Sequence, residues 1–93
     1  MASLNRNQTG SNAVLSAVAV TTTAKRVVTP RFNRVSLSLR NNGDVDLFVG
    51  GPNVTTATGY PIKSGEEYEF VDFLGELWVI AASAGDLRYI EVY

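Results

Sequence analysis

The clearest alternation of apolar and polar positions lies between residues 34 and 50, in the stretch RVSLSLRNNGDVDLFVG. Val35, Leu37 and Leu39 alternate with polar neighbours, as in a strand that buries one face. The pattern resumes at residues 45–49, after an Asn-Gly pair that tolerates positive φ in a type I′ turn. The stretch therefore predicts a β-hairpin with Asn42 and Gly43 at the centre of its turn.

Shorter segments elsewhere carry β-branched or alternating residues, which favour strands. Residues 12–23 are open to two interpretations, because Asn12 could cap a helical turn while Val18 and Val20 favour a strand over 17–22. We adopt the strand. Further strands are expected at residues 25–29, 67–73, 77–82 and 87–93, with a loop or weak edge strand at 54–59.

Seven or eight short strands separated by turn residues predict an all-β fold, a small antiparallel β-sandwich that is jelly-roll-like or immunoglobulin-like. Residues 13–93 would form this single domain, and residues 1–12, rich in Asn and small polar residues, would form a flexible N-terminal arm. Residues 77–82 are apolar on both faces, which predicts a strand buried between two layers. We therefore expect Trp78 in the core.

The composition excludes several classes of function. The sequence contains no cysteine, so it has no disulfide framework and no thiolate metal site. It also contains no histidine, which is the commonest general base and the commonest zinc ligand. It shows no secretory signal and no run approaching the ~20 apolar residues of a membrane span. We expect a protein that is not an enzyme, uses no cofactor or metal and does not enter a membrane.

Charge is distributed unevenly along the chain, although the net charge is only −1. Every acidic residue follows residue 41, and most basic residues precede it. Opposite charges could meet across paired strands, copies could associate head to tail, or the N-terminal arm could bind an acidic partner. Nucleic acid is not expected as a partner, because the basic residues are few and not interleaved with aromatic ones.

Two pairs of carboxylates are candidate sites. Asp44 and Asp46 would share one face of a strand and could offer oxygens to Ca²⁺, but their spacing matches no EF-hand loop. Glu67 and Glu69 form a second pair of the kind a glycosidase uses, but so small a domain rarely provides a sugar-sized cleft. Solvent-facing carboxylates are the favoured interpretation of both pairs.

Aromatic residues offer another candidate site, since Tyr60, Trp78, Tyr89 and Tyr93 could together form a platform for a sugar. Trp78 lies in the most apolar predicted strand, which favours packing in the core over contact with a ligand. Tyr93 ends the sequence and is expected to be the more exposed member.

Three segments, RVSLSLRNNGDVDLFVG, TGYPIKSGEEYEF and GELWVIAASAGDLRYIEVY, together resemble a group of small bacteriophage virion proteins of the capsid decoration or cement type, which includes head-fibre bases. In that group a strand with an Arg-x-Ser-Leu pattern meets an Asn-rich turn and a strand that ends in Val-Gly. The resemblance covers residues 25–93 and implies a β-sandwich that binds the capsid lattice and stabilises the head. The sequence carries no further domain of the kind a complete fibre has, which favours the cement role. The alternatives are a head-fibre or tail attachment module and a carbohydrate-binding module.

The resemblance also implies a location and partners. Such a protein is made in the host cytoplasm and lies on the capsid exterior, bound to the major capsid protein or another virion protein. A homo-oligomer is expected, with a trimer favoured, because closed symmetry covers edge strands.

The N-terminal arm is predicted to supply much of the attachment, because so polar a segment cannot bury enough surface to fold alone. Just after it, Val14 and Leu15 are placed to add a strand to the exposed edge of a neighbour. The predicted interface residues are Leu4, Arg6, Val14, Leu15, Lys25, Arg26 and Tyr93.

Overall fold

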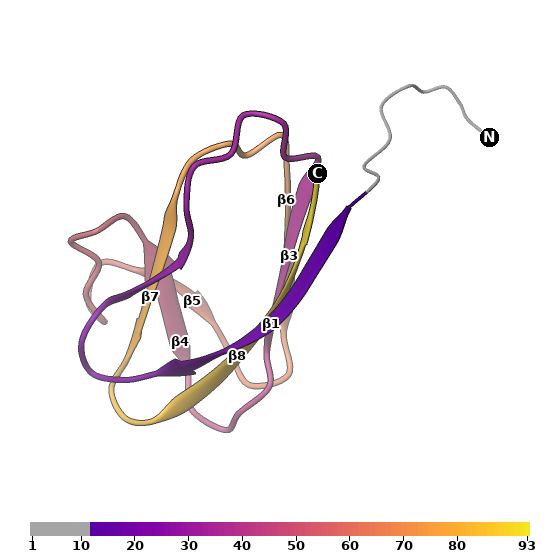
Figure 1. Ribbon diagram of the computed structural model, residues 1–93. Coiled ribbons are helices and arrows are strands. Elements are labelled where there is room, and N and C mark those ends of the chain that lie inside the picture. Colours follow the sequence, from indigo (N-terminus) through magenta and orange to yellow (C-terminus); the bar gives the residue numbers. More distant parts are fainter. Residues whose placement is uncertain (1–11) are drawn as a thin grey trace.

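Eight β-strands and no helix make up residues 12–93, the part of the chain that the computed structural model describes. The strands are β1 (Ala13–Val20), β2 (Lys25–Val28), β3 (Ser36–Asn41), β4 (Leu47–Gly50), β5 (Tyr60–Ile62), β6 (Glu67–Val71), β7 (Leu77–Ala81) and β8 (Gly85–Val92). They form two layers that face each other (Figure 1). The predicted all-β sandwich is confirmed.

Each layer is a sheet of four antiparallel strands. Sheet A has the order β1-β8-β3-β6, and sheet B has the order β2-β7-β4-β5. Every connection except the one from β4 to β5 crosses from one sheet to the other. This strand order is that of an eight-stranded jelly roll, so the jelly-roll-like form of the prediction holds and the immunoglobulin-like form does not.

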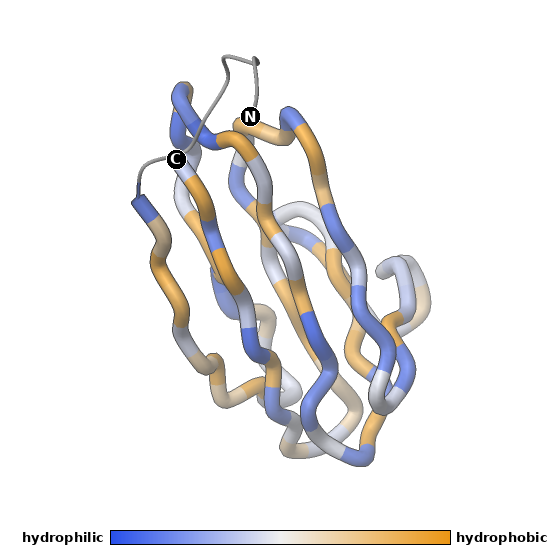
Figure 2. The backbone as a smooth tube through the Cα atoms, turned by 90° about the vertical axis from the view of Figure 1, so that its right-hand side faces the viewer, coloured by the Kyte–Doolittle hydropathy of each residue, from blue (hydrophilic) through white to orange (hydrophobic). Residues whose placement is uncertain are grey.

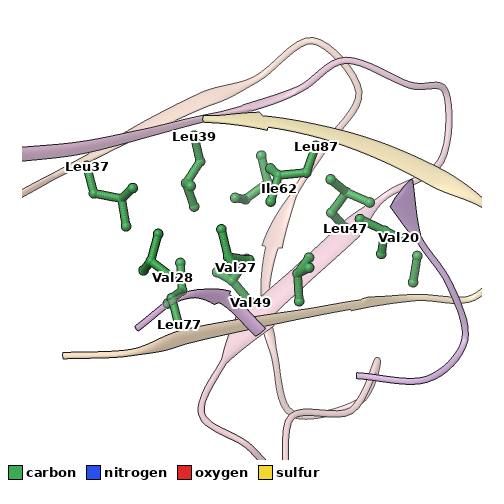
Figure 3. Packing of buried hydrophobic residues seen from close by; sticks show 12 residues of the cluster. Val20, Val27, Val28, Leu37, Leu39, Leu47, Val49, Ile62, Leu77 and Leu87 are labelled. Carbon is green, nitrogen blue, oxygen red and sulfur yellow. The ribbon is translucent and has the colours of Figure 1, made fainter. Parts of the chain in front are cut away.

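The core lies between the two sheets and is built from alternate residues of each strand. Leu37 and Leu39 of β3 point from sheet A toward Val49 and Leu77 of sheet B (Figure 3). Both leucines are almost completely buried. Burial of each such side chain contributes about 1.5–3 kcal/mol to the free energy of unfolding. The alternation in the sequence places these side chains on the inner faces of the sheets, and their burial is the main source of stability for the fold.

The predicted hairpin at residues 34–50 is wrong. β3 pairs with β6 and β8, whereas β4 pairs with β5 and β7, so the Asn-Gly segment crosses from sheet A to sheet B. Within residues 12–93, positive φ angles occur at Gly65 (+81°) and Asp72 (+61°), and not at Asn42 or Gly43. Two alternating segments joined by Asn-Gly are compatible with a hairpin and equally with a connection between two sheets. The alternation shows which face of a strand is buried, but it does not specify the strand with which it pairs.

A buried asparagine holds this corner. The Asn41 side chain is fully buried, and its Nδ2 donates hydrogen bonds of 2.8 Å to the carbonyl oxygens of Val45 and Ile62. Its Oδ1 accepts a hydrogen bond of 3.0 Å from the Gly43 amide. Since a buried polar group is stable only when it is hydrogen-bonded, these three bonds fix where the chain leaves sheet A.

The strand that contains Trp78 differs from the prediction. Leu77, Val79 and Ala81 are buried, whereas Trp78 and Ile80 are half-buried on the outer face of sheet B. The indole Nε1 of Trp78 donates a hydrogen bond of 3.0 Å to Glu76. The predictions that this strand lies between two layers and that Trp78 belongs to the core are wrong, because a two-layer sandwich covers only one face of each sheet.

Strand ends also shift. β1 begins at Ala13, four residues before the predicted start, and absorbs the segment for which a helical turn was the alternative. Asn12 extends the ladder beyond β1, because it exchanges two backbone hydrogen bonds with Tyr93. The beginning of β1 therefore lies beside the end of β8 (Figure 1).

A close approach of the chain to itself makes Gly59 sensitive to substitution. A Cβ atom at residue 59 would lie 2.6 Å from the Cβ of Phe48 and 2.8 Å from a methyl group of Val54. We expect Gly59→Ala to destabilise the protein by about 1–3 kcal/mol in urea unfolding. The matched control is Gly51→Ala, where nothing lies within 4 Å of the added methyl group and a change within about 0.5 kcal/mol is expected. Equal stability of the two variants would contradict this packing.

Candidate functional site

Hydrophobic and hydrophilic positions alternate along the strands of sheet A (Figure 2). On the outer face of this sheet, some apolar side chains are exposed. Leu15 of β1 and Ile90 of β8 lie opposite each other in register and are 68% and 42% exposed. Val71, at the end of β6, is 66% exposed. Strand β3 lies between β6 and β8, and on this outer face it contributes only the small side chains of Ser36 and Ser38 between Val71 and Ile90. We call Leu15, Val71 and Ile90 the apolar face.

A row of charged residues borders the apolar face. Arg40 and Arg88 lie directly opposite each other on β3 and β8, an arrangement that is repulsive unless each charge is neutralised. Arg40 forms an ion pair of 3.0 Å with Glu67, and Arg88 binds both carboxylate oxygens of Asp86 at 2.9 and 3.0 Å. The hydrogen bonds from Arg88, and then that from Asn42, lower the pKa of Asp86 below its ordinary value. The Asp86–Arg88 pair is therefore ionised at neutral pH.

A depression of about 630 Å³ crosses the middle of this face, lined by Leu15, Ala17, Ser38, Arg40, Arg88 and Ile90. An apolar centre with a charged border is the composition of a protein interface. Residues 12–93 hold no group of three or more acidic, His or Cys side chains placed to bind a metal ion. Nor do these residues form any helix long and apolar enough to span a bilayer.

The end of the sandwich near Tyr93 is held by a buried arginine that the sequence pattern places among the exposed polar residues. The Arg34 side chain is 0% exposed and donates a hydrogen bond of 2.8 Å to Glu91, itself buried. It also donates to the carbonyl oxygens of Phe73 (2.8 Å), Gly75 (2.9 Å) and Thr29. Arg34 thus ties the β2–β3 and β6–β7 connections to β8. Nothing in the local sequence distinguishes it from the exposed Arg40.

Comparison with known proteins gives one informative match. No known protein family and no curated protein matches the chain. A chain solved in work on Bacillus endospore appendages, described as "a novel family of disulfide-linked pili", superposes with a TM-score of 0.53. The two chains are 15% identical, and the match covers 88% of this chain and 84% of the other. The shared fold is a small β-sandwich.

Those of the predicted interface residues that lie within residues 12–93 do not form one surface. Leu4 and Arg6 lie outside the described residues. Within β1, Leu15 belongs to the apolar face, whereas Val14 is half-buried and points inward. Both residues pair with β8 along one side of β1, which is an edge strand of sheet A, so the addition of a strand to a neighbour stays a prediction.

The remaining predicted interface residues lie on β2 and at the end of β8. On β2, an edge strand of sheet B, Lys25 donates a hydrogen bond of 2.9 Å to the Ala19 carbonyl, and Arg26 lies 3.6 Å from Glu76. Tyr93 is covered by the guanidinium group of Arg31, whose carbon lies 3.6 Å from the centre of the tyrosine ring. The structure does not bring these residues together with Leu15.

The predicted aromatic platform is absent as well. Tyr60 stands at the open edge between β5 and β6, whereas Trp78 lies on the outer face of sheet B. Tyr89 packs against the core, and Tyr93 lies under Arg31. The four residues come from different faces of the molecule, because their positions within their strands point them in different directions.

The carboxylate pairs follow the favoured interpretation. Asp44 and Asp46 are exposed and precede β4 rather than sharing a strand face. Glu67 and Glu69 do share the outer face of β6, and Glu67 pairs with Arg40 across the strands.

The uneven charge distribution is explained by pairs between early and late segments. The pairs are Arg26–Glu76, Arg31–Glu91, Arg34–Glu91 and Arg40–Glu67, each joining a basic residue before position 41 to an acidic one after it. Charge pairing across the fold is thus confirmed for these residues.

Proposed function

We propose that this protein is a virion structural subunit, a capsid decoration protein that binds a repeated capsid lattice through the outer face of sheet A. The observation that carries the proposal is the apolar face. Monomeric proteins rarely expose large apolar side chains side by side unless the surface binds a partner. Here Leu15 and Ile90 are neighbours on adjacent strands, with charged residues along one side.

The geometry suits attachment to a lattice. A flat sheet face gives each copy a modest contact, and many copies on a repeated surface raise the overall avidity without strong single contacts. The eight-stranded jelly roll also recurs among viral capsid domains, which agrees with the resemblance to phage decoration proteins. On this proposal the partner is the major capsid protein or another virion protein, the location is the capsid exterior, and copies group as trimers.

Substitution of the apolar face tests this function. We expect Ile90→Asp and Leu15→Asp each to weaken binding to particles that lack the protein by at least ~30-fold, as for residues central to an interface. The measurement is occupancy after add-back over a range of concentrations. The matched control is Thr56→Asp, an exposed residue of the β4–β5 connection, which should bind as the original protein does.

Two results would contradict the proposal. One is full occupancy by both apolar-face variants at the original concentration, with melting temperatures that show them to be folded. The other is the absence of the protein from purified particles in mass spectrometry.

A second candidate, a subunit of a fibrous appendage, is supported by the structural match to a pilus chain. That neighbour is described as disulfide-linked, whereas this sequence has no cysteine. Copies of this chain would therefore have to assemble through non-covalent contacts. Electron microscopy of the concentrated protein distinguishes the candidates, since an appendage subunit forms filaments in the absence of a capsid.

A further inference from the structure

The most exposed large apolar side chain of residues 12–93 is Phe32, which is 89% exposed. It lies in the connection between β2 and β3, in a turn closed by a hydrogen bond of 3.2 Å from the Arg34 amide to the Arg31 carbonyl. An aromatic side chain held in water at a turn gains nothing from its position in the isolated chain. Its position needs another explanation.

The turn that carries Phe32 is firmly anchored on both sides. Before it, the Arg31 amide donates a hydrogen bond of 2.9 Å to the Leu74 carbonyl, and the Arg31 guanidinium group binds Glu91 and Tyr93. After it, the Arg34 side chain is buried in its own set of hydrogen bonds. The backbone at Phe32 is therefore held in place, so binding through this residue requires no ordering of the turn.

A hollow suited to an aromatic side chain lies at a different place, the open edge of the sandwich between β6 and sheet B. It measures about 400 Å³ and is lined by Tyr60, Tyr68, Phe70 and Leu77, with Glu69 as its acidic member. Strand β5 has only three residues and leaves this edge uncovered. The hollow thus opens onto side chains that otherwise belong to the core side of the sheets.

The rings along this edge form a continuous series. Tyr60 and Tyr68 lie 4.9 Å apart between ring centres, Tyr68 and Phe70 6.2 Å, and Phe70 and Phe73 5.5 Å, all in tilted arrangements. A further ring gains most from such tilted contacts. The hydroxyl groups of Tyr60 and Tyr68 bond to each other.

We propose that Phe32 of one copy inserts into the hollow at Tyr60 and Tyr68 of a second copy of this chain. Charge favours this occupant. Arg31 and Arg34, on either side of Phe32, share the one carboxylate of Glu91, which leaves a net positive charge there. Glu69, on the outer face of β6, borders the hollow with a negative charge. The two surfaces differ from each other, so the contact is heterologous. Successive contacts close into a ring or continue as a filament, according to the rotation between copies.

The inference does not depend on the proposed function. A ring of three would suit a decoration protein, and an open series would suit an appendage. Neither surface includes Leu15 or Ile90, so self-association and capsid binding can be lost separately.

A mixing experiment tests the contact. We expect Phe32→Ser, which lacks the inserting ring, and Tyr60→Asp, which alters the hollow, each to weaken self-association by at least ~30-fold in analytical ultracentrifugation. Mixed together, the two variants should form one-to-one dimers, because each supplies the surface that the other lacks. Leu15→Ser, which removes an exposed apolar side chain from the apolar face, is the matched control and should associate as the original protein does.

Cross-linking provides a measurement in variants that keep both Phe32 and Tyr60. The sequence has no cysteine, so an Asn33→Cys variant mixed with a Glu69→Cys variant should give mixed disulfide dimers on mild oxidation. Asn33→Cys mixed with Leu15→Cys should give few. Dimers in equal yield in both mixtures would overturn the proposal.

Other results would overturn it as well. One is an original protein that stays monomeric up to about 1 mM, where even weak specific contacts are populated. Another is a pair of single variants that associate like the original protein. A third is a sugar, found by glycan array, whose binding is abolished by Tyr60→Asp and unaffected by self-association.

Discussion

Replacement of Arg34 by methionine is expected to lower the free energy of unfolding by about 3–5 kcal/mol. The substitution keeps much of the side-chain volume but leaves the Glu91 carboxylate buried with one cationic partner fewer. It also removes the donors that satisfy the carbonyl oxygens of Phe73, Gly75 and Thr29. Urea unfolding measures the change.

The matched control for Arg34 is Arg40→Met. Arg40 also pairs with a glutamate, but its side chain is 48% exposed and that of Glu67 is 68% exposed. Exposed pairs of this kind contribute less than about 1 kcal/mol, because water screens them. If Arg34→Met and Arg40→Met lowered the free energy of unfolding by similar amounts, burial would not be the reason that the Arg34 hydrogen bonds stabilise the protein.

The second large effect is expected in the core, where Leu39→Ala should destabilise the protein by about 2–5 kcal/mol. Leu39 is 1% exposed and lies between the sheets, so its removal leaves a cavity. Trp78→Ala removes a larger side chain but should cost less than about 2 kcal/mol, since Trp78 is half-buried on the outer face of sheet B.

The comparison of these two variants is informative because side-chain size alone predicts the opposite order. Thermal melts and urea unfolding of both, in parallel, give the ranking. Greater loss of stability in Trp78→Ala than in Leu39→Ala would contradict the placement of Trp78 outside the core.

The candidate site could be predicted only in part. Leu15 was among the expected interface residues, and it does belong to the apolar face. Ile90, its neighbour on β8, and Val71, on the far edge strand β6, were not expected. They come from strands far along the chain and reach the same face only through the pairing of β1 with β8, of β8 with β3 and of β3 with β6. The same holds for the hollow at Tyr60 and Tyr68, which needs the edges of two different sheets.

The sequence by itself determined that the chain is all-β, where most of its strands lie, and which side chains of β3 and β6 face inward. These properties follow from local alternation of apolar and polar residues and from turn-forming residues, which act over a few positions. The tertiary structure alone decided that β3 and β4 belong to different sheets, that Arg34 is buried and that Trp78 is not. Strand pairing and burial depend on contacts between residues distant in the chain, and local patterns do not specify those partners.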